Sequence, residues 1–550
     1  MVKGMGGYPK YMQGSLELVE KTRPSRVGKT FTSMTADEKE EILREWHPDY
    51  KKGGKRPLRI GPNRGEIMPH EVAAIFEAHP LIAQDTIDLT GIDYDVDILI
   101  IGGGGAGLSA SIAALESGVE RDKILLVQKL RLGDSNSKMS QGGIQAAVSP
   151  DDSPAIHYLD TIGGGHFAND PALVEILVKE GPDVIRWHES LGVLYDKNPD
   201  GTTQLAAMGG TSRNRMHSCK DYTGLEITRV LMDEFLNREI PYVEFTCAIE
   251  LLMDDQGHVA GSVLYDLDSN EYLIAKAKST VLATGGFGRL HIQGFETTNH
   301  YGATGDGLAL AYHVGARIRD LDSTQFHPTG AAYPEQIVGQ LCTEKLRGRG
   351  AQPLNKYGEL FVYPLETRDV EASAIIRECY GRDNSIITPT NMRGVWLDTP
   401  LIDVINGEGT IEREFAAMYR NFNKFGINIR QEPMLVFPTL HYQNGGVAIN
   451  TQCKTSVPGL FAAGEVTGGV HGKNRLAGNS QLDLYVFGRR AGHFAADRAK
   501  KAAVGELTLS HLYRYERWLM EVGIETDRRA PVILPEYRGI RTLEHHLKLL

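Results

Sequence analysis

The sequence predicts an α/β fold, and two observations lead to this prediction. A continuous apolar run at residues 96–101 leads into the glycine cluster GGGGAG and then into an alanine-rich helical pattern. A second apolar run, ILLVQK, follows at residues 124–129. A strand, a helix and a second strand in this order form the β-α-β unit of a Rossmann-like parallel sheet. Further strand-like runs occur much later, at residues 279–286 and 459–465.

The composition indicates a globular protein of two or three domains. The chain has 550 residues, 41% of them apolar, and 61 glycines, which is too long for one compact core. Its net charge of −11 argues against a nucleic-acid partner, because nucleic-acid binders carry a basic surface. Five scattered cysteines without a CxxC pair predict no metal or iron–sulfur site in the chain itself.

The expected location is the cytoplasm. The cysteine usage is typical of a reducing compartment. No apolar run is long enough to span a membrane, and the opening MVKGMGGYPK lacks the apolar stretch of a secretory signal.

The two ends of the chain differ from its middle. Residues 1–94 form an N-terminal extension rich in charge and glycine, with helical patterns at ADEKEEILREW and PHEVAAIFEAH. Two interpretations of this extension remain open, a docking surface for a partner or a solvated tail. At the other end, LSHLYRYERWLMEV predicts a helix, and we expect residues 506–550 to form a helical C-terminal segment without a clear stop.

The glycine cluster predicts a dinucleotide site. Gly102, Gly104 and Gly107 form GxGxxG between a strand and a helix, where they allow a tight turn, close approach of a pyrophosphate and close helix–strand packing. The phosphates then meet the positive end of the helix. Gln128 and Lys129 stand where an acidic ribose ligand is expected, which makes NAD less suitable.

Two later motifs favour FAD. TSVPGLFAAGE (455–465) ends in Glu465, which a strand would bring within reach of a ribitol or ribose hydroxyl. The stretch ATGG, with Ala283, Thr284 and Gly285, is a second place where the backbone can pass close to the cofactor. Three such matches in this order are a strong signal, although each alone is modest.

His327 lies in STQFHPTGAAY, where the following proline makes the backbone extended and rigid. Taken alone, such a histidine is more often a packing residue than a catalyst. The surrounding chain, however, carries in order QGGI (141–144), TGDG (304–307), QFHPTG (325–330), TEKLRGRGA (343–351), TRD (367–369), HYQNGG (441–446) and KNRLAGNSQLD (473–483). From about residue 95 to about residue 505, it resembles the flavoprotein subunits of fumarate reductase and succinate dehydrogenase, together with L-aspartate oxidase.

The resemblance implies that one group of residues surrounds a four-carbon dicarboxylate. His441 and Arg475 would hold one carboxylate, and His327 and Thr343 the other. A flat dianion such as fumarate needs donors at both ends, and arginine offers a carboxylate two parallel hydrogen bonds. Hydride would pass from the flavin to one alkene carbon. The implied catalytic residues are Arg368, which matches the proton donor, and Glu344 and Arg347, which match the relay that reprotonates it. From the residues alone, Arg368–Asp369 is an ordinary ion pair.

The resemblance also implies the residues that bind FAD. Besides those named above, they are Lys129, Asn136, Ser137, Gln141, Gly142, Gly143, Asp306, Asn479, Ser480 and Leu482. Membrane-bound members attach FAD through a histidine just before the QGG motif. Here Asn136 stands in that segment, so FAD is expected to be bound non-covalently, which favours fumarate reduction.

Met208 separates the candidate substrates. Aspartate oxidase carries a glutamate before a Gly-Gly to meet the substrate's amino group, whereas this chain has Met208 before Gly209-Gly210. A thioether cannot pair with an ammonium group, which would cost several kcal/mol if left unpartnered in a buried site. We therefore expect a dicarboxylate without an amino group. Fumarate reduction is the first hypothesis, succinate oxidation the reverse, and aspartate oxidation the less favoured alternative.

The expected architecture is an FAD-binding domain in two pieces, residues 95–325 and 441–505, with an α+β capping domain, residues 326–440, inserted between them. The chain has no CxxCH and no ferredoxin-type cysteine spacing. The resemblance therefore implies that the electrons come from a separate iron–sulfur subunit, and it leaves open a membrane anchor or other redox subunits.

Overall fold

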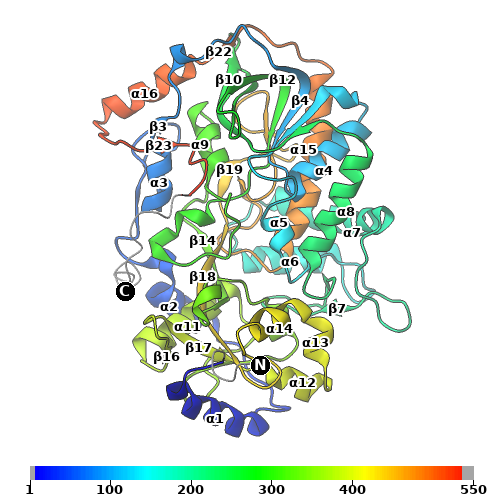
Figure 1. Ribbon diagram of the computed structural model, residues 1–550, viewed down its shortest axis with the longest axis vertical. Coiled ribbons are helices and arrows are strands. Elements are labelled where there is room, and N and C mark those ends of the chain that lie inside the picture. The colour runs from blue at the N-terminus through cyan, green and yellow to red at the C-terminus, as the bar shows by residue number, and fades with distance from the viewer. Residues whose placement is uncertain (1–6, 536–550) are drawn as a thin grey trace.

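The computed structural model describes residues 7–535, which build two main β-sheets covered by helices and four smaller sheets (Figure 1). The larger sheet has eight strands in the order β22–β10–β11–β12–β4–β5–β9, with β20 beside β12. Its parallel strands are β4 (Tyr94–Ile101), β5 (Ile124–Val127), β9 (Tyr242–Val243), β12 (Tyr272–Leu282) and β20 (Leu460–Ala462). Its antiparallel strands are β10 (Thr246–Asp254), β11 (Val259–Asp266) and β22 (Leu507–Thr508).

The predicted α/β class is confirmed, and the strand order explains the apolar run that predicted it. β4 lies between β12 and β5, and a central parallel strand is covered on both faces. The apolar runs end earlier than predicted: β5 stops at Val127, and ATGG and AGE are loops after β12 and β20. These loops begin at the carboxyl ends of the strands, where α/β sheets bind ligands.

Helices cover this sheet, and two of them meet almost backbone to backbone. α4 follows the glycine cluster and packs against α15, where a Cβ added to Gly492 would lie 2.1 Å from the carbonyl oxygen of Ala110. The helices of this unit are α4 (Gly105–Glu116), α5 (Asn136–Met139), α6 (Pro154–Gly164), α7 (Pro171–Leu191), α8 (Thr223–Asn237), α9 (Asp306–His313) and α15 (Asn479–Ala499). Two small sheets add β6 (Ile144–Gln145), β7 (Leu205–Ala206), β8 (Met216–His217), β13 (Ile318–Arg319), β19 (Gly446–Ala448) and β21 (Thr467–Gly468).

Residues 324–443 build a second sheet, referred to below as the capping unit, in the lower half of Figure 1. Its strands are β14 (Thr324–Ala331), β15 (Pro353–Leu354), β16 (Ile386–Ile387), β17 (Arg393–Leu397) and β18 (Met434–Gln443). Its helices are α10 (Lys345–Gly348), α11 (Arg368–Ile376), α12 (Pro400–Asn406), α13 (Thr410–Glu414) and α14 (Ala416–Asn423). β14 and β18, its first and last strands, pair antiparallel.

The N-terminal extension packs onto both units, so it is not a solvated tail. Its first helix, which the sequence analysis missed, lies beneath the capping unit, where Ser15 accepts a hydrogen bond of 2.8 Å from the Trp396 indole (Figure 1). Asp49 accepts bonds from Thr324 at the start of β14, and Ile60 accepts one from Tyr312 in α9. The extension contains α1 (Gln13–Thr22), α2 (Ala36–Trp46), α3 (His70–Phe76), β1 (Lys55–Pro57), β2 (Ile67–Pro69) and β3 (His79–Pro80).

The C-terminal segment is helical only in part. α16 spans His511–Glu521, after which the chain forms the short strand β23 (Arg529–Ala530) beside β3. The predicted helical pattern beyond residue 535 lies outside the described residues. Within residues 7–535, every helix is too short or too polar to cross a lipid bilayer.

Candidate active site

A long cavity runs from the glycine cluster of the larger sheet to the inner face of the capping unit. It contains about 1490 Å³ of space, including its open mouth. One end is lined by the loops after β4, β5, β12 and β20, and the other by side chains of β14, α11 and β18. The cavity therefore joins the predicted cofactor residues to the predicted substrate residues.

The glycine cluster has the geometry of a pyrophosphate cradle. Gly102 has φ +113°, and a Cβ on Gly107 would lie 1.8 Å from the Gly102 carbonyl oxygen, so only glycine lets helix and strand meet here. The amide of Gly103 donates to the Gln128 side chain at 2.7 Å. Gln128, which the sequence analysis treated only as a missing acid, therefore braces the loop. Gly102 and Gly104 line the cavity at the start of α4, where a helix attracts phosphate.

Lys129 and Asp306 form an ion pair inside the cavity. Their charged atoms lie 2.9 Å apart, and the Lys129 amine also donates to Thr304 at 2.9 Å. The TGDG motif and the end of β5 thus meet, although they are far apart in sequence. An NAD site would have a single acidic residue near this position, whereas here an ion-paired lysine and aspartate face the cavity.

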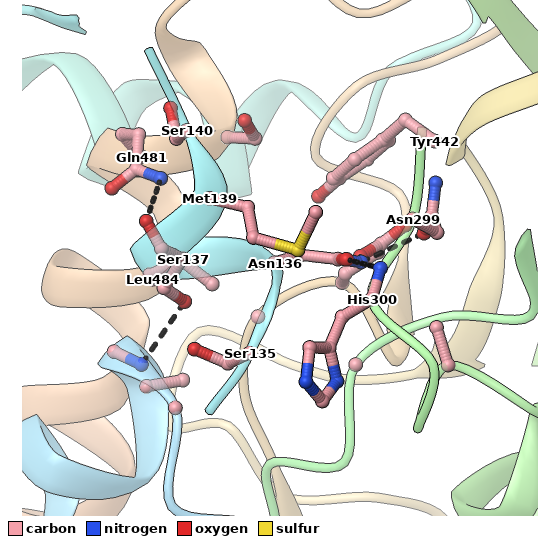
Figure 2. A pocket seen from close by; sticks show the side chains of 18 of the residues that line it. Ser135, Asn136, Ser137, Met139, Ser140, Asn299, His300, Tyr442, Gln481 and Leu484 are labelled. Carbon is pink, nitrogen blue, oxygen red and sulfur yellow. Dashed lines mark hydrogen bonds between the residues drawn. The ribbon is translucent and has the colours of Figure 1, made fainter. Parts of the chain in front are cut away.

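Asn136 occupies the centre of a hydrogen-bonded network, which Figure 2 shows at the cavity wall. Its amide donates to Asn299 at 2.7 Å and to Glu465 at 3.2 Å, and its oxygen accepts from the His300 backbone at 2.6 Å. On the other side of this segment, the Ser137 hydroxyl accepts from Gly105 at 3.1 Å. The sequence analysis missed Asn299 and His300, whose loop, TTNHYG, carries no recognisable motif.

Glu465 is a buried carboxyl that faces the same cavity. Burial raises its pKa to about 7, although Asn136 and the amide of Gln443 lower it by hydrogen bonding. Such a group can accept or donate a hydrogen bond at neutral pH. The nearby Thr284 hydroxyl and Gln141 amide oxygen are buried without a hydrogen-bond partner among the described residues. Polar groups left in this state fit a bound polar cofactor such as FAD.

Most predicted cofactor residues line the cavity, and three do not. Gly107 serves helix–strand packing, Asn479 bonds to His157 and Thr161 behind the wall, and Leu482 lies in the core. The predicted residues that line the cavity are Gly102, Gly104, Lys129, Asn136, Ser137, Gln141, Gly142, Gly143, Ala283, Thr284, Gly285, Asp306, Glu465 and Ser480.

At the other end, the two predicted histidines stand side by side. The rings of His327 on β14 and His441 on β18 have their centres 5.0 Å apart. Thr298 and His441 Nδ1 share a hydrogen bond of 2.7 Å, which fixes the ring. Burial, with nearby arginines, holds both pKa values well below the usual 6.5. Both imidazoles are therefore neutral at pH 7 and offer one donor and one acceptor each.

Arg475 is a buried cation without a carboxylate partner in the part of the chain that the structure describes. Its Nη1 donates to the Ser480 hydroxyl at 2.8 Å, its Nε has no hydrogen bond, and its guanidinium lies 4.6 Å over the Tyr442 ring. Burial and the charge of Arg368 lower its pKa to about 9. A free guanidinium edge in a cavity is suited to a carboxylate ligand.

Arg368, Glu344 and Arg347 form a connected chain. Arg368 Nε donates to Glu344 Oε2 at 2.6 Å, and Arg347 Nη2 lies 3.4 Å from the same oxygen. Arg368 also donates to Gln325 at 3.0 Å. Burial lowers the pKa of Arg368 despite Glu344. Arg368, Glu344 and Thr343 line the cavity, whereas Arg347 lies behind them.

Two further predictions about this region have a structural outcome. Asp369 pairs with His166 at 2.6 Å rather than with Arg368, so the ordinary Arg368–Asp369 ion pair is not formed. Met208 is buried and lines the cavity, and the neighbouring amide of Gly209 donates to Glu344 at 2.9 Å. Position 208 therefore presents a thioether to the cavity, beside the Glu344 carboxylate that pairs with Arg368.

Comparisons with known proteins agree with this geometry. Residues 97–481 match the family model described as an FAD binding domain. The chain is 40% identical over 422 residues to one component of the CoM/CoB fumarate reductase of Methanothermobacter marburgensis, covering 74% of each chain. It is 36% identical to L-aspartate oxidase of a Nostoc species, covering 74% of this chain and 69% of that one.

Among solved structures, the chain is similar to the FrdA chain of E. coli quinol fumarate reductase. The TM-score is 0.70 at 30% sequence identity, and the match covers 78% of this chain and 74% of the other.

Proposed function

Because the chain belongs to the FAD binding domain family and is an FAD-dependent oxidoreductase of the fumarate reductase and succinate dehydrogenase type, we propose that it is the catalytic flavoprotein subunit of a fumarate reductase. The observation that carries this proposal is the excess of buried positive charge at the inner end of the cavity. Arg368 and Arg475 face it beside neutral His327 and His441, with Glu344 as the neighbouring anion.

This charge suits a small dianion. Reduced FAD, bound non-covalently in the outer part of the cavity, would supply the hydride. Arg475 and His441 would bind one carboxylate of fumarate, and His327 and Thr343 the other. Each charge-assisted hydrogen bond contributes roughly 1.5–3 kcal/mol. Polarising the second carboxylate draws electron density from the double bond.

Arg368 would donate the proton to the second alkene carbon. Its lowered pKa and its 2.6 Å contact with Glu344 support this role, because free arginine is too weak an acid unless its environment favours release and return of the proton. Glu344 and Arg347 would return the proton. Succinate oxidation is the same chemistry in reverse.

Met208 argues against aspartate as the substrate. The side chain at position 208 offers no carboxylate to an ammonium group, and the Glu344 carboxylate beside it is already paired with Arg368. Two buried arginines also repel a cation. The similarity to L-aspartate oxidase therefore reflects a shared fold and a shared way of binding carboxylates.

We also propose the division into domains and the partner. The proposed parts are the extension (1–94), the FAD-binding domain (95–325 and 441–505), the capping domain (326–440) and the C-terminal segment (506–550). The strands β14 and β18, which span 324–331 and 434–443, support the bounds of the capping domain to within a few residues. Closing of the cap would bring His327 and His441 onto the substrate and expel water. All five cysteines are free and buried, which supports a reducing, cytoplasmic compartment. The electron donor would be a separate iron–sulfur subunit, with a membrane anchor as a further candidate partner.

The test is an assay of the purified FAD-loaded chain with a reduced viologen dye and fumarate, alongside dye-linked oxidation of succinate and aspartate. We expect fumarate reduction to be fastest and aspartate oxidation to be absent; turnover with aspartate alone would refute the proposal. Acid denaturation should release all flavin from the polypeptide, because Asn136 cannot form a covalent link. Copurification from the native source should bring down an iron–sulfur protein.

A further inference from the structure

We propose that Glu371 extends the proton relay beyond Arg347 and stores the proton that is passed back to Arg368. This inference rests on the proposed function of the site. Glu371 does not line the cavity and acts through Arg347, so it is a relay residue that does not touch the substrate.

The relay is a continuous set of buried contacts. Arg368 contacts Glu344, Glu344 contacts Arg347, and Arg347 Nη1 forms an ion pair with Glu371 Oε2. The side chains of these four residues are between 0% and 8% exposed. Arg368 and Glu371 are three residues apart on α11 and therefore share a helix face. The first and last residues of the relay thus face Glu344 and Arg347, which lie at the start of α10 and within it.

The packing around Glu371 does not look like that of a purely structural ion pair. Neither carboxylate oxygen has a well-aligned hydrogen bond from a described residue. Arg347 is similarly open, since its Nε and Nη2 lack such bonds while its Nη1 donates to the Pro364 carbonyl at 2.8 Å. A buried structural carboxylate is normally satisfied at both oxygens, whereas a relay group must exchange partners.

Burial favours the protonated form of Glu371. Burial raises its pKa to about 8; Arg347 and Arg368 oppose the rise, and the carboxylates of Glu344 and Glu366 add to it. Glu344, by contrast, has a lowered pKa, because Arg368 and Arg347 outweigh its burial. One relay thus contains an ionised and a protonated carboxyl at pH 7, and such a difference is the basis for assigning acid and base roles.

The other elements packed against α11 also carry titratable groups, and the segment that follows it, Arg377–Gly381, brings Arg377 and Glu378. β14 and β18 bring the neutral rings of His327 and His441. α2 brings Lys39, whose amine lies 2.8 Å from Glu366 and is 30% exposed. Glu366 also accepts from the amide of Met34 at 2.8 Å. This side of the N-terminal extension leads from the buried carboxyls toward solvent.

The proton balance of one turnover is simple. Fumarate gains a hydride and, from Arg368, one proton. Arg368 recovers that proton through Glu344 and Arg347 from the carboxyl of Glu371, which becomes a carboxylate and then takes a proton from water. During succinate oxidation the proton moves the other way, so that reaction needs Glu371 ionised. Fumarate reduction should therefore slow above about pH 8, and succinate oxidation should accelerate there.

The experiment compares FAD-loaded wild type with Glu371→Gln, Glu371→Asp and a matched control, Glu378→Gln. Glu378 is an equally buried glutamate that pairs with Arg382 away from the cavity. For Glu371→Gln we expect kcat for fumarate reduction at pH 7 to fall about tenfold or more, since acid–base groups contribute about 10²–10⁴. KM should stay unchanged, because Glu371 does not touch the substrate. The fall in the fumarate-reduction rate above about pH 8 should be absent in Glu371→Gln. It should occur at a different pH in Glu371→Asp and at the wild-type pH in Glu378→Gln.

The outcomes are separable. If the wild type does not reduce fumarate, the proposed function fails. If it does, and Glu371→Gln keeps the wild-type rate and pH profile, the relay extension is overturned. If Glu371→Gln loses its flavin or unfolds, the pH dependence of fumarate reduction by Glu371→Asp decides. A rate that falls at the same pH as in the wild type would also overturn the inference.

Discussion

Replacing Arg475 with methionine should make the ligand-free protein more stable and weaken fumarate binding at the same time. Burial lowers the pKa of Arg475 from its usual value to about 9, and at about 1.36 kcal/mol per unit, holding this charge costs the fold roughly 5 kcal/mol. Methionine removes the charge at similar length. It also removes the Ser480 hydrogen bond and the Tyr442 ring contact, each roughly 1 kcal/mol. We therefore expect a net stabilisation of about 1–4 kcal/mol.

The effect of Arg475→Met on the free energy of fumarate binding should be unfavourable and larger than its effect on stability. The free edge of Arg475 can make two charge-assisted hydrogen bonds to one carboxylate, worth about 3–6 kcal/mol together. Their loss corresponds to a rise of about 10²–10⁴-fold in the dissociation constant of fumarate. A residue kept only for packing would not both lower the stability of the fold and raise the affinity for the ligand.

Urea unfolding of the FAD-loaded protein, with and without fumarate, measures both effects, because a ligand stabilises the state that binds it. Arg215 is the matched control: it is also buried, but it pairs with Asp152 and Asp160, so Arg215→Met should cost about 3–5 kcal/mol. A ligand-free Arg475→Met protein that is less stable than the wild type, or one that binds fumarate normally, would contradict the reasoning.

Three further predictions concern single side chains. Thr298→Val should raise KM for fumarate about three- to tenfold, because His441 loses the bond that orients it; an unchanged KM in steady-state assays would show that the ring is fixed otherwise. Met208→Glu should lower kcat/KM for fumarate by at least about tenfold and allow binding of aspartate, since a carboxylate near two substrate carboxylates repels them; isothermal titration with both acids tests this. Burial alone would raise the pKa of Glu250, but His313 and His511, the latter on α16, lower it to about 2. Glu250→Gln should therefore cost roughly 1.5–3 kcal/mol at pH 6–7, and the difference should shrink as the pH falls from 4.5 toward 2; a difference that does not depend on pH in urea unfolding would refute this.

The sequence was sufficient where function depends on local chain geometry. The glycine cluster could be predicted as a cradle because Gly102 and Gly107 sit between a strand and a helix, and the backbone there must approach within 1.8 Å of a would-be Cβ. The strands β4, β5 and β12 could be predicted from their apolar runs, which are also a local feature of the chain. Not all residues assigned by family motif line the cavity: Asn479 and Leu482 turn into the protein.

The remainder depends on tertiary contacts that no local pattern records. Thr298 and Asn299 lie in an ordinary polar loop and gain a role only because β18 brings His441 beside them. Glu371 looks like any polar residue of a helix until Arg347 is found against it. α1 has no side-chain cap, and its buried residues are covered by the capping unit, which lies far away in the sequence.

The place of α1 has a consequence for how the chain is made. The Trp396 side chain that donates to Ser15 is synthesised 381 residues later, and the Asp398 partner of Arg23 comes 375 residues later. At about 5–20 residues per second, a ribosome needs roughly 20–75 s to cover that distance. During this interval Met12, Leu16 and Val19, which end up buried, have no native surface to cover them. The newborn chain therefore carries these three apolar side chains without their native cover until the capping unit has been synthesised.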